Sequence, residues 1–529
     1  MKSKIFIGVI IIVGIYVVGR ILVFNQLRKV IYKEITALKA QGIEIEMAQL
    51  QVGPWKNRVQ LDSVRIRFVE GKGTDTRIRA EAGTITLRGI ALYRAVMRRE
   101  LWVHSVQLSS PFIQTAHRRG ESPSTDQSPK SPALKRFFFK RVHIEQGRWR
   151  LNDGSNTPIR ITTLDRVNLR DFSVLNPGKG KLHWKVGKTD VSAVKIDFPK
   201  NYYNLFIKAV FYNANRKKLT LDSIKLTPYY NKAEFAQKNG KQTGRLDALI
   251  PYLHAVGCQL ESAPVFKLHA DKINLKFRLE SYVDKRYPFE NEADRVLPVE
   301  FLQDLPIDLQ IDTLRVEDSY AEHEERPEEG DATGKVTFHK INATLANLSN
   351  NKASGQRLIP PALSVTALFM GIGDLRLEGG FPHHAKENYY LSGVMYHFPF
   401  TKLNNVIEPL AKARIESGYL NWIKFNFKYN NDRSDGEVEM NYKDLKVTTF
   451  KKDNPEKKAK FKNFILNNFI LKEDINEGMK EDKRTGTIQF YRDRRRSLLH
   501  YWWKSVFSGA LSVYNIDKMP APKAAADSK

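Results

Sequence analysis

Apolar and charged residues alternate in short runs along most of this chain. The runs Ile307–Asp312 (IDLQID) and Glu437–Tyr442 (EVEMNY) show the pattern clearly. Successive side chains of a β-strand point to opposite faces of a sheet, so each run predicts a strand with one apolar and one polar face. The chain is therefore predicted to be mostly β, with apolar surface that either the sheet itself or a bound ligand must cover.

Expected strands extend from residue 43 almost to the C-terminal end. They include Ile43–Val52, Val59–Phe68, Arg77–Leu87, Val103–Leu108, Phe137–Glu145, Arg148–Leu151, Val336–Leu345, Gly418–Tyr429 and Glu437–Leu445. In the second of these strands the apolar phase shifts between Leu61 and Val64, which predicts a β-bulge. Helical patterns are few, and the main ones are Lys232–Asn239 and Arg245–Val256.

The N-terminal residues predict a membrane-spanning helix over residues 1–24. Lys2 and Lys4 precede the uncharged run Ile5–Gly19, and after Arg20 the apolar character resumes as far as Phe24. About 20 apolar residues suffice to cross a bilayer, and lysines before the segment favour a cytoplasmic N-terminus with the remaining chain outside the cytoplasm. A cleaved signal peptide is the alternative, although no A-x-A-like site precedes Arg20.

Composition restricts the class of protein. The chain has 529 residues, which is long enough for two to four domains, and 42% of them are hydrophobic, which is enough for ordinary cores. The single Cys258 excludes an internal disulfide framework. The formal charge of +28 favours an anionic partner. Outside the cytoplasm that partner would be anionic lipid and not nucleic acid; alternatively, residues such as Arg65 and Arg67 only fill the polar faces of strands.

Two polar segments interrupt the strand pattern. Residues 117–133, rich in Ser, Pro and Gly, are expected to be a flexible linker. The acidic segment Glu317–Asp331 predicts a solvated hairpin loop, because it lacks the Asp-rich, glycine-containing loop of a calcium site.

Motifs of catalysis are missing from the sequence. It contains no phosphate-binding loop, dinucleotide fingerprint, Gly-x-Ser-x-Gly, His-Glu-x-x-His or cysteine pair. The adjacent His383 and His384 would point apart on an extended chain, so a loop is favoured over a metal site. We therefore expect no enzyme activity, catalytic residue, metal or cofactor.

Several segments together resemble the AsmA-like superfamily of envelope proteins. Gly53-Pro54-Trp55, the strand Val59–Phe68, the run Ala82–Leu87 and the strand ending at Ile113 occur in the order of the opening module of that family. Phe139–Leu151 is similar to its strand–turn–strand unit. Leu403–Leu410, followed by Ile415–Leu420 and the paired strands around Val438 and Val447, is similar to its C-terminal module.

The resemblance implies a domain order and a fold. The domains would be an anchor at 1–24, a helix-plus-β module at 25–116, the linker 117–133, a β-rich region at 134–335, a C-terminal β module at 336–450, terminal strands and an amphipathic helix at 451–517, and a disordered tail at 518–529. The fold would be an elongated, twisted, open antiparallel β-groove with few short helices.

The resemblance also implies a location and a function. The chain would be a single-pass inner-membrane protein, with most of its length in the periplasm, that shields lipid acyl chains during phospholipid transport between membranes and supports outer-membrane homeostasis. Its partners would be membrane lipids, the inner membrane, and outer-membrane or envelope proteins. The alternating pattern supplies the candidate groove residues, which are Val59, Leu61, Ile66, Phe68, Ile85, Leu87, Ile144, Leu309, Ile311, Val438, Met440 and Tyr442.

A basic and aromatic segment near the C-terminus offers a second candidate membrane contact. A helix from Leu498 would place Leu499, Trp502, Trp503, Val506 and Ala510 on one face, as in an interfacial helix. The candidate contact residues are Arg494, Arg495, Arg496, Trp502, Trp503 and Phe507. The alternative is that this helix caps the end of the sheet or plugs the groove.

Two other functions stay open at this point. A structural or assembly factor of the envelope would use the same apolar faces as closed, dry sandwich cores and would bind other proteins. An extracytoplasmic hydrolase would need carboxylates clustered in a cleft, which one sequence does not reveal.

Overall fold

The computed structural model describes most of the chain between residues 43 and 513. The described residues are 29, 36, 43–53, 57–68, 76–91, 94, 98, 100–117, 136–175, 183–262, 265–289, 294–350, 361–382, 387–411, 413–449 and 484–513. The expected anchor 1–24, residues 118–133 of the expected linker, the tail 518–529 and the His383-His384 pair lie outside these residues.

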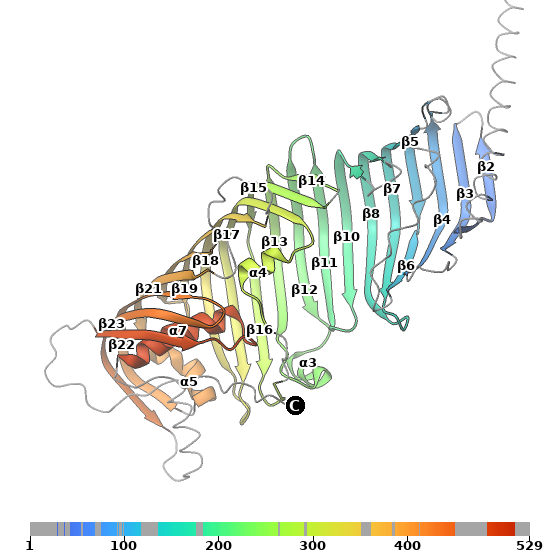
Figure 1. Ribbon diagram of the computed structural model, residues 1–529. Coiled ribbons are helices and arrows are strands. Elements are labelled where there is room, and N and C mark those ends of the chain that lie inside the picture. The colour runs from blue at the N-terminus through green and yellow to red at the C-terminus, as the bar shows by residue number, and fades with distance from the viewer. Residues whose placement is uncertain are drawn as a thin grey trace, which may run out of the picture. The chain divides into compact units, whose positions relative to one another are not determined.

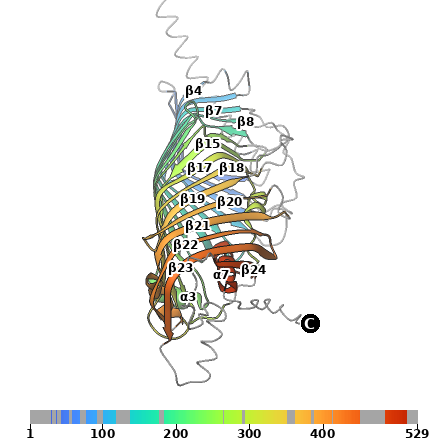
Figure 2. The same cartoon turned by 90° about the vertical axis from the view of Figure 1, so that its left-hand side faces the viewer.

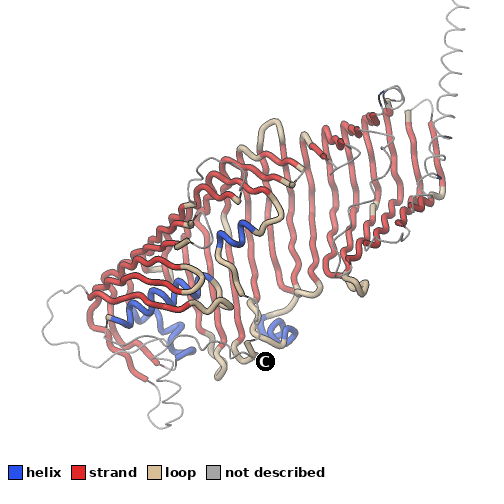
Figure 3. The backbone as a smooth tube through the Cα atoms, viewed as in Figure 1, coloured by secondary structure: helices blue, strands red, loops and turns tan. Residues whose placement is uncertain are grey.

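The described strands form one large sheet (Figures 1 and 3), and the predicted mostly-β class is confirmed. The sheet has 24 strands in the described residues and is mixed but largely antiparallel; the pairings of β5 with β7, β6 with β7, and β16 with β17 are parallel. In none of these three pairs are the two strands joined by a tight hairpin. A tight hairpin can join only antiparallel strands, and parallel strands need a longer connection.

The chain divides into two compact units, which are described separately. The N-terminal unit comprises Met1–Ile224 and Gln259–Lys267. Its strands are β1 (Ile43–Glu46), β2 (Gln49–Gly53), β3 (Arg58–Phe68), β4 (Thr76–Ile90), β5 (Glu100–Ser109), β6 (Phe112–His117), β7 (Arg136–Asn152), β8 (Pro158–Leu175), β9 (His183–Lys185), β10 (Lys188–Phe198), β11 (Tyr203–Asn213), the first part of β12 (Lys218–Pro228), and β14 (Gln259–Glu261).

The C-terminal unit comprises Lys225–Cys258 and Leu268–Lys529. Its strands are β13 (Arg245–Val256), β15 (Lys267–Leu275), β16 (Arg278–Asp284), β17 (Asp308–Arg326), β18 (Gly334–Ser349), β19 (Ala362–Phe369), β20 (Gly373–Gly380), β21 (Tyr389–Pro399), β22 (Ala413–Tyr429), β23 (Arg433–Thr449) and β24 (Arg484–Tyr491). Its helices are α3 (Lys232–Asn239), α4 (Pro298–Gln303), η1 (Phe400–Leu403), α5 (Asn404–Ala411) and α7 (Leu498–Ser512).

Residues with left-handed backbone interrupt the strands of the N-terminal unit at matching positions. Ser63 in β3, Gln146 in β7 and Ala193 in β10 have φ of 51°, 55° and 48°. Pairing keeps the same register on both sides of each residue, for example at Asp62–Thr84 and Val64–Ala82. The apolar phase nevertheless changes by one there, so the phase shift predicted in β3 is real, but it is no bulge with an inserted residue.

Two predictions about the C-terminal unit are wrong. Residues 245–256 form strand β13 and not a helix, because Pro251 would break a helix interior. In the sheet, Pro251 lies between a segment paired with β16 and a segment paired with β15.

The acidic segment is the second correction. Glu317–Arg326 belongs to strand β17 and is not loop. Its carboxylates are neutralised by lysines: Lys335 Nζ lies 2.8 Å from Glu322, and Lys232 Nζ lies 2.5 Å from Glu324. Helix α3, by contrast, begins and ends as predicted for Lys232–Asn239, with Asn231 as its N-cap and Gly240 as its C-cap.

None of the helices in the described residues combines the length and the apolar character needed to cross a membrane.

Candidate apolar binding surface

Strands of the N-terminal unit share a five-residue segment in which the second and fourth residues are apolar. Examples are 58–62 (RVQLD) in β3, 105–109 (SVQLS) in β5 and 141–145 (RVHIE) in β7. Residues paired across strands lie on the same face of a sheet. The strand register therefore decides whether these apolar positions join into a surface.

The register aligns them into two continuous rows across eight strands, β2, β3, β4, β5, β7, β8, β10 and β11 (Figure 1). We call these the apolar rows. The first row is Leu50, Leu61, Ile85, Leu108, Ile144, Val167, Val191 and Val210. The second row is Val52, Val59, Leu87, Val106, Val142, Leu169, Thr189 and Tyr212, in which Thr189 interrupts the apolar side chains.

The apolar rows are only partly shielded from water. Leu50, Val59, Val106, Val142, Val167 and Tyr212 are at most 8% exposed, whereas the other members, Leu61, Ile85, Leu108 and Ile144 among them, are half-buried. Every element of this unit whose bounds are described is a strand, and the described residues Lys29, Thr36, Arg94 and Arg98 are helical. Half-buried aliphatic side chains lie side by side on β3, β4, β5 and β7 in the first row, and gathered apolar surface of this kind is typical of a binding site.

The opposite face of the same strands is polar. Gln60, Thr86, Gln107, His143 and Asn168 form one row on this face. His143 Nδ1 lies 2.6 Å from Asn168 Oδ1, and its Nε2 lies 2.8 Å from Glu145 Oε1. The hydrogen bond with Glu145 raises the pKa of His143 above its ordinary value. These hydrogen bonds of His143 thus lie on the face opposite the apolar rows.

The C-terminal unit has apolar rows of its own. One of them crosses β17 to β24 through Leu314, Leu345, Leu363, Gly379, Leu391, Phe427, Gly436 and Ile488. Its members on β17, β18 and β19 are half-buried, whereas Leu391, Phe427 and Ile488 are almost completely buried.

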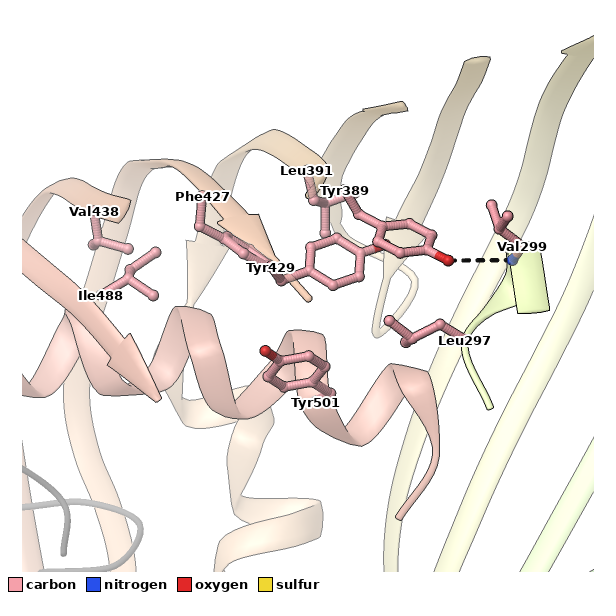
Figure 4. Close-up of a cluster of buried hydrophobic side chains, with 9 residues drawn as sticks. All are labelled: Leu297, Val299, Tyr389, Leu391, Phe427, Tyr429, Val438, Ile488 and Tyr501. Atoms are coloured by element: carbon pink, nitrogen blue, oxygen red, sulfur yellow. Dashed lines mark hydrogen bonds between the residues drawn. The ribbon is translucent and has the colours of Figure 1, made fainter. Parts of the chain in front are cut away.

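Helix α7 accounts for that burial. It packs on β23 and β24 (Figure 2), and together with α4 it encloses the cluster shown in Figure 4. The rings of Tyr389 and Tyr429 stack 5.0 Å apart, and the backbone N–H of Val299 donates a hydrogen bond of 3.2 Å to the Tyr389 hydroxyl. This end of the apolar surface is a dry core.

Burial also shifts the pKa of two side chains that α7 itself carries, His500 and Lys504. Burial lowers the pKa of His500 to about 4, and nearby Lys504 and Arg496 add to the effect. Burial, with a contribution from Lys285, lowers the pKa of Lys504 to about 8. Both shifts follow from placing cations in a weakly solvated site.

The structure brings five of the predicted groove residues together. Val59, Leu61, Ile85, Leu87 and Ile144 all lie in the apolar rows. Two further candidates, Ile66 and Phe68, lie on β3 beyond the left-handed Ser63, and the side chain of Phe68 is outside the described residues. On β17, Leu309 is half-buried and Ile311 is buried opposite Leu348.

The remaining candidates belong to the covered end of the C-terminal unit. Val438 is fully buried beneath α7, and Met440 packs with Phe398 and Leu420. Tyr442 lies against Phe400 and beneath the guanidinium of Arg484, 4.3 Å from the ring centre. These three side chains face protein.

The candidate membrane-contact residues are also largely occupied by protein contacts. Arg494 pairs with Asp432 at 2.6 Å, while Arg495 and Arg496 pair with Asp493 at 3.0 and 3.9 Å. Phe507 is buried, Trp502 packs against Tyr429 at 6.1 Å between ring centres, and Trp503 is 49% exposed. Of the two interpretations left open for this helix, its contacts match the one in which it covers the sheet.

Most members of the apolar rows were not identified from the sequence. They include Leu50, Val106, Leu108, Val142, Val167, Leu169, Val191 and Val210. Their local signal is the five-residue segment bounded by phase shifts, but their alignment depends on strand pairing.

One group of three potential metal ligands occurs in the described residues. His269, Asp271 and Asp312 have ligand atoms within 4.8 Å of one another. Both aspartates are exposed, and hydrogen bonds of 3.3 Å join His269 to Asp271 and Gln310 to Asp312. Side-chain hydrogen bonding on a strand face accounts for this group without an ion.

Comparison with known proteins gives no relative. No protein-family model matches the chain, and neither does any curated protein.

Proposed function

We propose that the N-terminal unit binds lipid acyl chains along its apolar rows and that the protein moves phospholipid between membranes without catalysing a reaction. The observation that carries this proposal is the continuity of the rows, which place half-buried aliphatic residues on eight neighbouring strands. The rows would line an open groove with the polar rows on its outer side.

The dimensions and energies are suitable for acyl chains. Seven steps of about 4.8 Å between strands give a row of roughly 34 Å, about twice the ~15 Å depth of one leaflet of a bilayer core. An acyl chain on this surface avoids about 0.8 kcal/mol per CH₂ group that would otherwise contact water. Headgroups would remain at the polar edge, where no desolvation is needed.

The resemblance to the AsmA-like superfamily supports the same function. On that basis we further propose an inner-membrane anchor at 1–24, a periplasmic location for the remaining chain, and a role in outer-membrane homeostasis. Envelope proteins at either membrane would complete the path.

A second candidate function rests on the covered end of the C-terminal unit. Val438, Ile488 and Tyr501 are at most 2% exposed beneath or within α7, so this region is closed to lipid. A structural or assembly factor with dry cores and protein partners would have such packing throughout. The half-buried residues Leu61, Ile85, Leu108 and Ile144 of the N-terminal unit favour lipid binding over this alternative.

Transfer of a fluorescent phospholipid from donor to acceptor vesicles by the full chain tests the proposal. Leu108→Glu places a carboxylate in the middle of an apolar row. Since an unpaired charge in an apolar contact costs several kcal/mol, we expect transfer to fall at least about tenfold.

Gln107→Glu is the matched control, because it adds the same charge one residue away on the polar face. It should transfer lipid at the rate of the unsubstituted chain. Equal rates for the two variants, with both folded by circular dichroism, would contradict the proposal.

A further inference from the structure

The polar face of the N-terminal unit carries a row of cations. Register aligns Arg58, Arg88, Ser105, Arg141, Arg170 and Lys188 across β3, β4, β5, β7, β8 and β10, and we call this set the basic row. Arg88, Arg141, Arg170 and Lys188 are exposed. Five strand spacings of about 4.8 Å give the row a length of roughly 24 Å.

Other cations of the same unit are paired with carboxylates. Arg65 lies 4.0 Å from Glu81, Arg67 lies 3.6 Å from Glu46, and Lys195 lies 3.3 Å from Asp197. Those pairs neutralise the flanks of the face and account for part of the charged residues of the strands.

The basic row differs from these flanks. In the described part of the chain, none of its five cations lies within ion-pair distance of a carboxylate, and Arg58 has a buried Nε without a hydrogen-bond partner. The carboxylates of this face lie in the other two polar rows. There Gln60 donates a hydrogen bond of 2.8 Å to Asp62, Glu145 pairs with His143, and Asp190 lies opposite Asn168.

The face is suited to a broad anionic surface. Its central rows from β3 to β10 contain one ring, that of His143, so they lack the aromatic platform on which single-stranded nucleic acid stacks. Lipid headgroups, by contrast, diffuse laterally and can gather opposite a fixed line of charges. Arginine suits phosphate because its planar guanidinium donates paired hydrogen bonds.

We propose that the basic row binds the phosphate headgroups of an anionic membrane surface. This site lies on the face opposite the apolar rows and does not depend on acyl-chain binding there. It holds the polar face of the N-terminal unit against a bilayer by electrostatic attraction, with an affinity that falls as salt screens the charges.

The test is capture of vesicles by the full chain held in neutral phosphatidylcholine nanodiscs. The protein should capture vesicles that contain 30% phosphatidylglycerol and leave pure phosphatidylcholine vesicles free. In the triple variant R88Q/R141Q/R170Q we expect affinity for the anionic vesicles to fall roughly 100-fold. Each arginine near a charged surface contributes a factor of about five, and three are removed. Capture should also weaken steeply between 50 and 500 mM salt.

The variant R65Q/R67Q/R79Q controls for net charge, since it removes three arginines that already lie beside Glu46 or Glu81. It should bind anionic vesicles within about threefold of the unsubstituted chain, because paired charges contribute little. Substituting the three basic-row arginines by lysine should restore most of the binding. Equal losses in the two glutamine variants, or equal capture of neutral and anionic vesicles, would overturn the proposal.

Failure of a soluble acidic protein or a nucleic acid to displace the unsubstituted chain from the anionic vesicles would support the preference for lipid. Tighter binding of such a polyanion than of the anionic vesicles, lost in R88Q/R141Q/R170Q, would overturn the assignment to lipid.

Discussion

At the scale of single residues, the unusual feature is a left-handed backbone at residues other than glycine. Ser63, Gln146 and Ala193 take this conformation at matching positions of three strands. It costs roughly 1–2 kcal/mol for a residue with a Cβ atom. The benefit is that the apolar phase shifts by one in each strand, from Leu61 to Val64 and from Val191 to Val194.

Comparison of Ala193→Gly with Ala209→Gly measures this strain. Both substitutions lose one methyl group and loosen the unfolded chain, but only Ala193 has a left-handed backbone. Ala193→Gly is therefore expected to have a free energy of unfolding about 1–2 kcal/mol higher than Ala209→Gly. Urea denaturation of the two variants checks this difference, and equal destabilisation would mean that Ala193 is not strained.

At the scale of elements, helix α7 covers part of the apolar surface of the C-terminal unit. Ser497 caps the helix by accepting a hydrogen bond of 3.2 Å from the N–H of His500. Tyr501, Ser505 and Ser508 are buried toward the sheet, and the hydroxyls of Ser505 and Ser434 lie 2.7 Å apart. Exposed Leu499 and Trp503 lie on the other side. The helix thus closes one end of the C-terminal unit.

Gly509→Ala tests how closely α7 contacts the sheet. A Cβ at this position would lie 2.6 Å from Ile488 Cγ1 and 2.9 Å from Val438 Cγ2, closer than carbon atoms pack. Alanine is normally favoured over glycine in a helix by about 1 kcal/mol, yet here we expect overpacking to destabilise the protein by about 1–3 kcal/mol.

Gly244→Ala is the control for that variant, because a Cβ at Gly244 meets nothing within 4 Å. Its thermal unfolding should match the unsubstituted chain within a few degrees. A higher unfolding temperature for Gly509→Ala would show that α7 stands away from β23 and β24.

At the scale of the whole molecule, the sequence predicted the class of fold and part of the candidate site. Alternation alone assigned Val59, Leu61, Ile85, Leu87 and Ile144 to one face, because the two-residue period of a strand is local. The rows could not be predicted from the sequence. Strand β5 pairs in parallel with β7, although β6 lies between them in the sequence, and no local pattern encodes such a pairing.

The same limitation explains why the burial of the groove candidates near the C-terminus could not be predicted from the sequence. Val438 and Met440 alternate as an exposed apolar strand face would, but a helix about 60 residues later in the chain covers them. The sequence predicted α7 from its own pattern, and only tertiary packing shows that its buried side includes Phe507 and not Trp503.

Acyl chains are proposed to lie on the apolar rows. The most direct measurement is photolabelling of the full chain with a neutral phosphatidylcholine that carries a diazirine in its acyl chain, followed by mass spectrometry of peptides from β5 and β7. We predict label on the half-buried Leu108 and Ile144, and little on Gln107 or Glu145. Absence of label from both strands, or equal label on their two faces, would contradict it.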